Sequence, residues 1–390
     1  AALLRDRQGL MWVGMIGGGV NVVDTRSKIF GYNPLSAVRH MLHTASVRSM
    51  YQDDDGKLWM GIGSSGFGIL NEASGRFQHC MQLEDFKAYP AFSSTVRTIM
   101  QSPSTGHVWI GVYDGGLFEY DRQAPAGRRV KHYLSSDKDP WLCGDCIYHV
   151  YEDSTRNIWA ATRTGISVRR ADGRALRLDS LKVNGTFLRD MICLQTLENA
   201  RGDMWVATER HGVVRIQGSG SNWRMYRTTL YTTDSGKLNH NHVQCLFKDS
   251  RGRIWVGSAG TGLTLYDEAT DSFLPVHSRW NLPGDAVVSI LEGTDGALWI
   301  GTNVGLLKLK VKEYTEASFH LYTMEDGLQE NIFNAGAAFC TPDGEMYFGG
   351  LRGYNRFYPG QLQGRSFFSR AVLTDFKIFN HSWKNFPEED

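Results

Sequence analysis

The sequence predicts an all-β fold, a β-propeller of four-stranded blades, on three observations. The chain has 43 glycines but only 10 prolines among 390 residues, and 12% of its residues are aromatic. This composition is typical of aromatic-rich strands joined by tight turns. A phrase of the type Gly-x-Leu-Trp-x-Gly also recurs along the chain, and its spacing of 44 to 50 residues is that of a propeller blade.

The aromatic residue of this phrase marks eight units. The eight anchor residues are Trp12, Trp59, Trp109, Trp159, Trp205, Trp255, Trp299 and Tyr347. We expect seven blades, with the first unit left over from, or completing, a neighbouring propeller; an eight-bladed ring is the alternative. Because blades pack face to face around an axis, one aromatic residue per blade predicts a ring of core side chains.

Each unit is expected to supply four strands, from the innermost to the outermost. The first is an apolar run such as 47–51 or 287–291, which is buried on both faces. A hairpin turn follows, led by Asp or Asn six positions before the anchor, with Gly three positions before it. The anchor strand, a second Gly turn and two further strands complete the unit. Substitutions at Pro103, Arg156 and Gly293 predict altered hairpins in three units.

Composition excludes several function classes. The 42 Lys and Arg residues balance 41 Asp and Glu residues, so no charge footprint points to a nucleic acid or an anionic membrane surface. No apolar run approaches the roughly 20 residues of a membrane helix. Six cysteines are too few for a disulfide scaffold, and only Cys143 and Cys146 lie close together. A loop disulfide or two free thiols are the main alternatives for this pair. A redox pair and half of a zinc site are the less favoured alternatives.

Candidate ligand residues come from one face of the propeller. The turn after each anchor strand and the long link to the next blade should emerge on the same face. Aromatic rings and guanidinium groups on that face would suit a carbohydrate. The alternative for the tryptophans is that they seal loops or a dimer contact. The ligand candidates are Tyr113, Asp114, Trp141, Arg163, Arg210, His211, Trp223, Trp280, Asn303 and Arg352.

The residues of the repeat resemble a known family. The Asp-x-x-Gly-x-Leu-Trp-x-Gly units, the turn at 17–21 and the closing phrase at 327–350 resemble the two-component-regulator propeller repeats. Such repeats occur in extracytoplasmic sensor regions of hybrid two-component systems from gut Bacteroidetes. Residues 371–380 look like the first strand of the immunoglobulin-like domain that follows the propellers in that family. The resemblance implies a propeller over 1–366 and an incomplete immunoglobulin-like domain over 367–390.

The resemblance also implies a function. It points to a periplasmic sensor domain of an inner-membrane receptor that binds an oligosaccharide, as in polysaccharide utilisation, and relays the signal to a histidine kinase outside this chain. A homodimer through the full sensor is expected, with membrane contact only through other segments. The first alternative is a structural or dimerisation propeller whose ligand site lies on other domains.

An enzyme is the second alternative. A glycosidase or polysaccharide lyase would require paired carboxylates facing one cavity. The loop acids Glu84, Asp85, Asp114, Asp137, Asp139 and Asp285 cannot be paired from the sequence. No catalytic motif appears, and His240 and His242 have no third metal ligand. We therefore expect no catalytic residues, no cofactor and no metal in this chain.

Overall fold

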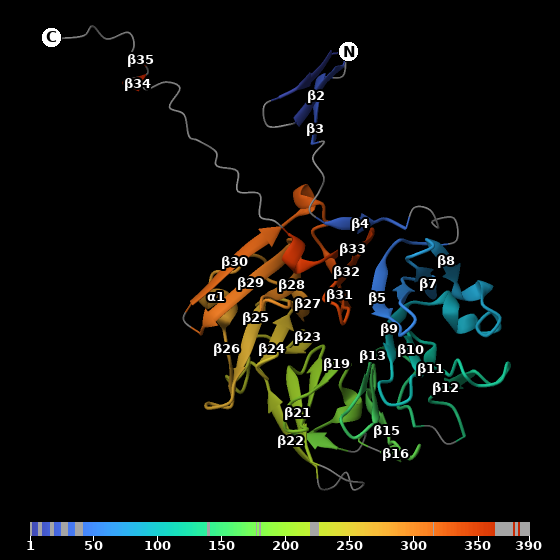
Figure 1. Cartoon of the computed structure of the whole chain (residues 1–390). Coiled ribbons are helices and arrows are strands. Elements are labelled where there is room, and N and C mark those ends of the chain that lie inside the picture. Colours follow the sequence, from blue (N-terminus) through green and yellow to red (C-terminus); the bar gives the residue numbers. More distant parts are fainter. Residues whose placement is uncertain are drawn as a thin grey trace.

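The computed structural model describes residues 2–6, 10–15, 19–24, 30–35, 42–138, 141–176, 178, 181–218, 226–314, 316–362, 377–378 and 381–382. These residues form an almost purely β structure (Figure 1), which confirms the predicted fold class. Among them, no helix is both long enough and apolar enough to cross a membrane.

Six four-stranded antiparallel sheets follow one another along the chain, and each is one blade. Blade 1 is β5 (Val47–Gln52), β6 (Lys57–Ile62), β7 (Phe67–Asn71) and β8 (Arg76–His79). Blade 2 is β9 (Val96–Gln101), β10 (Val108–Val112), β11 (Gly116–Tyr120) and β12 (Val130–Tyr133). Blade 3 is β13 (Ile147–Glu152), β14 (Ile158–Thr162), β15 (Gly165–Arg169) and β16 (Ala175–Leu176).

The next three blades have the same strand order. Blade 4 is β19 (Cys193–Glu198), β20 (Met204–Thr208), β21 (Val213–Gln217) and β22 (Arg227–Tyr231). Blade 5 is β23 (Val243–Lys248), β24 (Ile254–Ser258), β25 (Leu263–Asp267) and β26 (Ser272–Leu274). Blade 6 is β27 (Val287–Glu292), β28 (Leu298–Thr302), β29 (Leu306–Glu313) and β30 (Glu316–Tyr322). Short elements such as β17 (Lys182–Val183), β18 (Thr186–Phe187) and α1 (Val276–Arg279) lie in the links.

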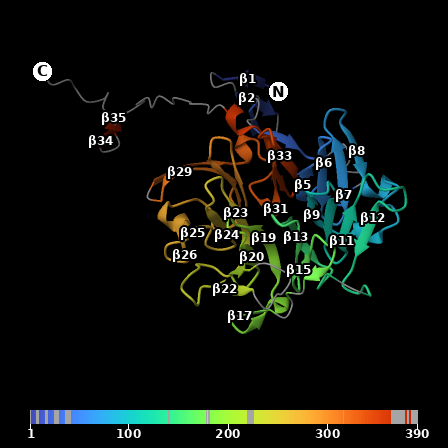
Figure 2. The same cartoon turned by 60° about the horizontal axis from the view of Figure 1, so that its bottom comes forward.

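Blade 7 joins the two ends of the ring. It contains β31 (Phe333–Cys340), β32 (Met346–Gly350) and β33 (Gly353–Phe357), and its fourth strand is β4 (Gly31–Asn33) from the other end of the chain. Each innermost strand packs on the next, from β5 through β31, and β31 packs on β5. The blades therefore form a closed ring around an axis (Figure 2).

The first sequence unit is divided between two places. Its fourth strand, β4, belongs to blade 7, whereas β1 (Ala2–Arg5), β2 (Leu10–Met15) and β3 (Gly19–Asp24) form a separate three-stranded sheet. Trp12 on β2 is accordingly 38% exposed, while the other seven anchor aromatics are at most 4% exposed. The expected core ring is thus confirmed for those seven residues and wrong for Trp12, because no blade packs on either face of its sheet in the described residues.

The C-terminal prediction falls largely outside the described residues. Of the segment 367–390, only β34 (Lys377–Ile378) and β35 (His381–Ser382) are described, and they pair as a two-stranded sheet. The proposed immunoglobulin-like domain over 367–390 stays a prediction.

The leading aspartate fixes the hairpin between the first two strands of a blade. Asp153 accepts the backbone N–H groups of Thr155 and Asn157 through Oδ1, at 2.9 and 2.8 Å. Its Oδ2 accepts the indole Nε1–H of the anchor Trp159 at 2.7 Å. The same indole bond recurs in blades 1 and 5, from Trp59 to Asp53 and from Trp255 to Asp249. The predicted Asp-led hairpins are confirmed.

The substituted hairpins differ in their side-chain bonds. Where Pro103, Asn199 or Gly293 replaces the aspartate, the indole Nε1 of the following anchor is buried without a hydrogen-bond partner among the described residues. The backbone bond that closes the blade 6 hairpin, from Gly293 N to Ala297 O, is unchanged in spacing. Arg156 replaces glycine but adopts the left-handed backbone that the turn requires, with φ of 65°. The hairpins with Arg156 and Gly293 therefore keep the regular backbone course, and the predicted alteration is wrong for them. The hairpin with Pro103 is one residue longer, closed by a bond from Ser102 N to His107 O, so the prediction is confirmed there.

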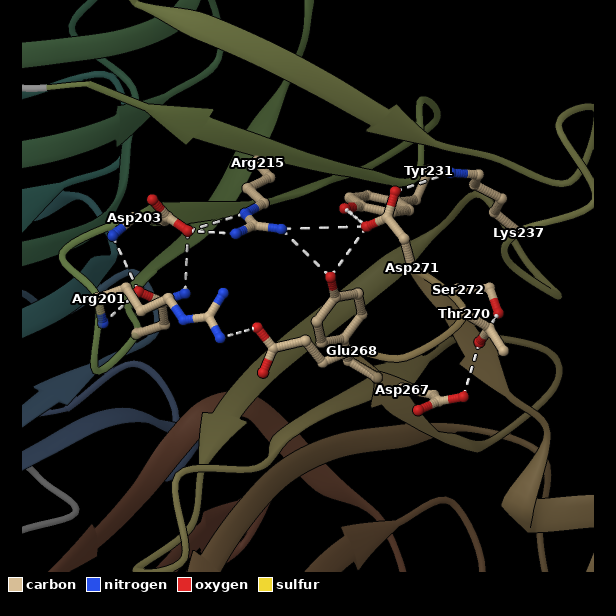
Figure 3. A network of polar contacts seen from close by, with 12 residues as sticks. Arg201, Asp203, Arg215, Tyr231, Lys237, Asp267, Glu268, Thr270, Asp271 and Ser272 are labelled. Atoms are coloured by element: carbon tan, nitrogen blue, oxygen red, sulfur yellow. Dashed lines mark hydrogen bonds and ion pairs between the residues drawn. The ribbon is translucent and has the colours of Figure 1, made fainter.

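A polar network joins blades 4 and 5 where Asn199 replaces the aspartate (Figure 3). Arg215 on β21 donates two bonds to Asp203 and one to the Tyr266 hydroxyl on β25. Its guanidinium also lies 5.3 Å from the centre of the Trp205 ring. Asp271 accepts the hydroxyls of Tyr231 and Tyr266. The network thus ties two neighbouring blades together through polar groups that are largely shielded from solvent at Arg215 and Asp203 and half-exposed at Asp271.

Candidate functional site

Two kinds of loop share one face of the ring, which we call the link face. The second turn of a blade and the link to the next blade are joined there by backbone bonds. Gly116 N–H donates to Asp145 O, and Gly212 N–H donates to Asn241 O. The same pairing joins Gly66 to Ser94 and Gly262 to Asp285. The predicted meeting of turns and links on one face is confirmed.

A cavity of about 530 Å³ runs along the axis of the ring. It is lined by residues of the innermost strands of blades 1 to 5 and 7. Its volume lies in the range of small-molecule sites. The side chains at its link-face end therefore decide what it can hold.

The innermost strands of blades 1 to 6 each carry a β-bulge at the second residue, whereas the register of β31 in blade 7 shifts between Phe333 and Ala338. The register of β5 against β6 shifts between Val47 and Ser49, and that of β13 against β14 shifts between Ile147 and His149. The pairing of β9 with β10 shifts at the same place. Arg48, Arg97 and Tyr148 are the extra residues of these three bulges. A bulge re-aims a side chain out of the regular alternation, so these residues differ from the core residues beside them.

Arg97 lies between two tyrosine rings. Its guanidinium is 5.5 Å from the centre of the Tyr113 ring and 5.3 Å from that of Tyr148. The two rings meet edge to face, with centroids 6.2 Å apart. We call Arg48, Arg97, Tyr113 and Tyr148 the arginine–tyrosine cluster. It comprises residues of three consecutive blades at the link-face end of the cavity.

The cluster holds two positive charges that no acid of the described residues contacts in an ion pair. Neither Arg48 nor Arg97 forms an ion pair with any residue that the structure describes, whereas Arg122, Arg215 and Arg253 each contact an aspartate. Burial, followed by the like charge of Arg97, lowers the pKa of Arg48. The Arg97 Nε atom is buried without a hydrogen-bond partner in the same described set. Such an arrangement costs free energy unless a ligand supplies an acceptor.

Uncharged groups surround the two arginines. Burial raises the pKa of the Cys146 thiol, which hydrogen-bonds with Tyr148 and with the backbone of Asp114. Burial lowers the pKa of His149, the neighbour of Tyr148, to about 4. Asp114 occupies the left-handed region with φ of 54° and forms no ion pair with either arginine. At neutral pH the thiol is therefore protonated and the imidazole is neutral.

The structure brings some of the predicted ligand residues together and separates others. Tyr113 and Asp114 lie at the arginine–tyrosine cluster. Arg163 is exposed on the turn beside it, and its backbone N–H donates to Cys146 O. Arg210 is 81% exposed and pairs weakly with Glu209 at 3.7 Å. The adjacent His211 has a buried Nδ1 without a partner among the described residues.

Two further candidates are engaged in local contacts. Asn303 donates to Asp285 Oδ1 at 2.7 Å and accepts backbone N–H groups of the same link. Arg352 forms an ion pair with Glu330 at 2.9 Å. Both side chains therefore stabilise the turns that carry them.

The tryptophan candidates correct the sequence analysis. Trp141 is only 8% exposed and packs edge-on against Trp109 and Tyr133. Trp280 packs on Trp255 and donates its indole N–H to Tyr314 O at 3.1 Å. These two residues seal links against the blade core, which was the alternative to ligand contact. Trp223 lies outside the described residues.

The remaining chemical candidates are occupied by structural contacts. Cys143 and Cys146 are free thiols, so the loop disulfide is absent, and Cys143 Sγ contacts the Ser167 hydroxyl at 3.0 Å. Asp85 accepts bonds from Tyr120 and Arg129, and Asp137 accepts the Leu134 N–H of its own turn. The described ranges contain no group of three His, Cys, Asp or Glu residues suited to a metal.

Sequence reasoning missed Arg48, Arg97 and Tyr148. They sit inside apolar runs that were interpreted only as buried strands. Aligning the units on their anchors places Arg48 and Tyr148 eleven residues before the aromatic residue, where the other units have Leu194, Gln244 and Val288. Arg97 is twelve residues before Trp109, because the hairpin of that unit is one residue longer, so it aligns only when this extra residue is allowed for. A charged residue at a position that is otherwise uncharged was the available signal.

The comparisons with known proteins bear on the repeat. A family described as two component regulator propeller matches residues 41–63, 237–260 and 281–304. The chain carries two-component regulator propeller repeats. These three matched segments end in the second turns or anchor strands of blades 1, 5 and 6, so the repeats are the units of the ring.

Relatives with the same architecture include sensor domains. The chain is 22% identical over 284 residues to histidine kinase P4 of Formosa agariphila. This alignment covers 70% of this chain and 16% of that protein. It superimposes on the extracellular domain assigned to the hybrid two component system BT3049 of B. thetaiotaomicron with a TM-score of 0.71 and 21% identity, over 92% of this chain and 45% of that one. Thus the chain spans less than half of either protein.

Enzymes share this fold too. Virginiamycin B lyase from Staphylococcus aureus superimposes with a TM-score of 0.57 and 12% identity, over 80% of this chain and 94% of the lyase. At these identities the structural likeness shows the propeller fold alone. The function must therefore be argued from the site.

Proposed function

We propose that this chain is the ligand-binding propeller of an extracytoplasmic sensor in a hybrid two-component receptor, and that its ligand is an oligosaccharide. The observation that carries the proposal is the arginine–tyrosine cluster at the mouth of the axial cavity. Tyrosine rings stack on the apolar faces of sugars, and guanidinium groups donate hydrogen bonds to sugar oxygens. The sensor assignment draws on the likeness to the histidine kinase and to the B. thetaiotaomicron extracellular domain.

In this proposal the chain binds but does not catalyse. Three of the loop acids that a glycosidase could use hold local structure: Asp85 accepts the Tyr120 hydroxyl, Asp137 accepts the Leu134 N–H, and Asp285 accepts the Asn303 amide. Signal output belongs to a histidine kinase outside this chain, reached through the periplasmic part of an inner-membrane protein. A closed ring is rigid, so relay would operate through the way two sensor copies meet.

Isothermal titration calorimetry tests the proposal. The purified chain is titrated with a panel of neutral and acidic oligosaccharides, and each mixture is analysed afterwards by chromatography for cleavage. We expect saturable binding to at least one oligosaccharide without cleavage. Tyr113→Ala and Tyr148→Ala should weaken it about three- to tenfold, the usual contribution of one aromatic contact.

Trp12→Ala is the matched control, because Trp12 is a partly exposed aromatic residue on the sheet outside the ring. The affinity of the Trp12→Ala variant for the oligosaccharide should equal that of the wild type. Absence of binding across the panel would argue for a structural propeller, and cleavage products would argue for an enzyme.

A further inference from the structure

We infer that the ligand of the arginine–tyrosine cluster carries an acidic group, a carboxylate or a sulfate ester, that is held between Arg48 and Arg97. The inference rests on the proposed function and specifies the class of oligosaccharide. It begins from the contrast between these two arginines and Arg122, Arg215 and Arg253, which are partly buried and paired with aspartates.

Three partly buried arginines elsewhere in the ring are matched by acids of the same chain, whereas Arg169 lies over the rings of Trp109 and Tyr133 without an ion pair among the described residues. Arg122 lies 2.6 Å from Asp53, and Arg253 lies 2.6 Å from Asp249. Arg215 is held by Asp203 at 2.5 Å. A partly buried guanidinium is stable in a protein when a carboxylate and hydrogen bonds satisfy it. Arg48 and Arg97 have no such acid within the part of the chain that the structure describes.

The neighbours of Arg97 hold it in place without neutralising it. The rings of Tyr113 and Tyr148 lie 5.5 and 5.3 Å from its guanidinium carbon. Contact with two ring faces stabilises a cation and fixes its plane. It leaves the N–H groups without acceptors, and one of them, on Nε, is fully buried. The side chain is therefore positioned but unsatisfied.

The second arginine, Arg48, adds to the positive electrostatic potential of the cluster. Arg48 occupies the equivalent bulge of the neighbouring blade, and the two like charges disfavour each other. The other titratable groups at the cluster bring no opposite charge into contact: Asp114 forms no ion pair with either arginine, and burial keeps the Cys146 thiol protonated. A bound anion would remove the repulsion and fill the missing acceptor positions.

The chemistry of the anion follows from the guanidinium fork. Carboxylate and sulfate oxygens both accept paired N–H bonds from arginine, whereas a sugar hydroxyl offers one oxygen. Two arginines beside two aromatic faces suit a sugar ring that bears such a group. The shared property is one negative charge on the sugar, and the experiment separates its two sources.

Titration calorimetry with matched saccharide pairs is the direct test. One pair is a uronate oligosaccharide and its methyl ester, and the other is a sulfated oligosaccharide and its desulfated form. We expect the charged member of one pair to bind at least tenfold more tightly than its neutral partner. Arg97→Ala and Arg48→Ala should each cause a tenfold loss, equal to about 1.4 kcal/mol.

Two further variants serve as controls for the effect of Arg97→Ala. Arg97→Lys keeps the charge but not the fork, so its loss should be smaller than that of Arg97→Ala. Arg251→Ala removes an exposed arginine from a hairpin at the opposite end of a blade, so it should bind like the wild type. Equal binding of charged and neutral members, unaffected by Arg97→Ala, would overturn the inference and leave the proposed function standing.

A second measurement does not depend on the saccharide panel. The melting temperatures of the wild type and of the Arg48→Gln/Arg97→Gln double variant are compared in sodium sulfate and in sodium chloride of equal ionic strength. We expect sulfate to raise the melting temperature of the wild type more than that of the double variant. If no saccharide binds but this difference appears, the oligosaccharide proposal fails and the anion site survives. An equal effect of sulfate on both proteins would overturn the anion site.

Arg48→Gln alone checks the premise that the charge is unmatched. Removing one of two repelling charges should leave the melting temperature equal or higher, as expected for a residue kept for binding. A lower melting temperature would show that Arg48 has a structural role and would count against the inference.

Discussion

A single aspartate both closes a hairpin and anchors the core aromatic residue of its blade. In blade 3, one oxygen of Asp153 accepts two backbone N–H groups of the turn, and the other accepts the indole of Trp159. The carboxylate and the indole are shielded from water, because Asp153 is 8% and Trp159 is 4% exposed. Buried hydrogen bonds to a charged acceptor are among the stronger ones in proteins. The repeat therefore couples turn geometry to core packing through one residue.

Replacing this aspartate should destabilise the ring. Asp153→Ala leaves the indole N–H and the turn N–H groups without acceptors, so we expect the free energy of unfolding to fall by about 2–3 kcal/mol. Urea denaturation followed by tryptophan fluorescence measures the change. Asp172→Ala is the control, since Asp172 is exposed and accepts one turn N–H. A loss as large in the control would contradict the special role of the Asp–Trp pair.

His149 gives the stability of the ring a dependence on pH. Its Nδ1 accepts the Thr196 N–H at 3.3 Å, and burial lowers its pKa from 6.5 to about 4. The unfolded chain therefore binds one more proton than the folded chain between these values. By linkage, this group's contribution is complete above pH 6.5 and is lost as the pH falls towards 4.

Measuring unfolding free energy from pH 7 to 4 tests this residue. We expect the wild type to lose stability more steeply than His149→Gln, whose amide oxygen can still accept the Thr196 N–H. Identical pH profiles of the two proteins would show that His149 binds its proton at the same pH in the folded and in the unfolded chain, which would contradict the lowered pKa. An NMR titration of the imidazole would check the direction of the pKa shift independently.

At the scale of elements, blades are held to each other by polar contacts of unequal strength. Arg215 is 11% exposed and pairs with Asp203, which is 12% exposed. Arg201 pairs with Glu268 across the same blade boundary (Figure 3), but both side chains are more than half exposed. Buried pairs are costly to break because the remaining charge stays unsolvated, whereas exposed pairs contribute little.

This contrast predicts two different outcomes. Arg215→Ala leaves the Asp203 carboxylate without its guanidinium partner and removes the contact with Tyr266. The free energy of unfolding should therefore fall by about 3 kcal/mol. Arg201→Ala should change it by less than about 1 kcal/mol. Denaturant unfolding of the two variants measures both values. Equal losses would mean that the network acts through charge alone and not through burial.

Ring closure depends on β4 rather than on the sheet before it. Phe30, next to β4, is 3% exposed and packs edge-on against Tyr322 and Phe357. Phe30→Ala should cost about 3–5 kcal/mol through the cavity it leaves. Removal of residues 1–29 should instead leave the unfolding transition of the ring nearly unchanged. A large effect of that deletion, measured by calorimetry, would show that β1–β3 stabilises the ring.

For the whole molecule, closure makes the ring a rigid body. The innermost strands contact one another in an unbroken circle, and blade 7 joins both ends of the chain. A ligand at the axis can therefore tighten the ring but not rearrange its blades. We propose that two sensor copies change their mutual contact when the ligand binds.

X-ray scattering of this chain with and without saturating ligand tests that view. The two scattering profiles should superimpose. For a longer sensor that contains this chain, the sedimentation coefficient should change with ligand, since the contact between copies would differ. A changed profile of the isolated chain would contradict rigid relay and would indicate movement of blades.

Much of the fold could be predicted because repetition makes local signals additive. The Asp-led turn, the anchor aromatic and the second Gly turn each specify a short segment, and their recurrence fixed the order of strands within a blade. The meeting of the second turns and the links on one face followed from the same strand order. The Trp141 and Trp280 assignments failed because an aromatic residue in a link can face either solvent or the blade beneath it, and sequence does not distinguish the two.

By itself the sequence determined the all-β class, the four-stranded unit and the core role of seven anchor aromatics, since each recurs in a repeated unit whose strands pair with their neighbours along the chain. Only the tertiary structure decided that β4 closes blade 7, that Arg97 lies between Tyr113 and Tyr148, and that the strand of Arg48 packs beside that of Arg97. The reason is physical. Ring closure and the axial site join residues far apart in the chain, and their proximity depends on how all the blades pack together.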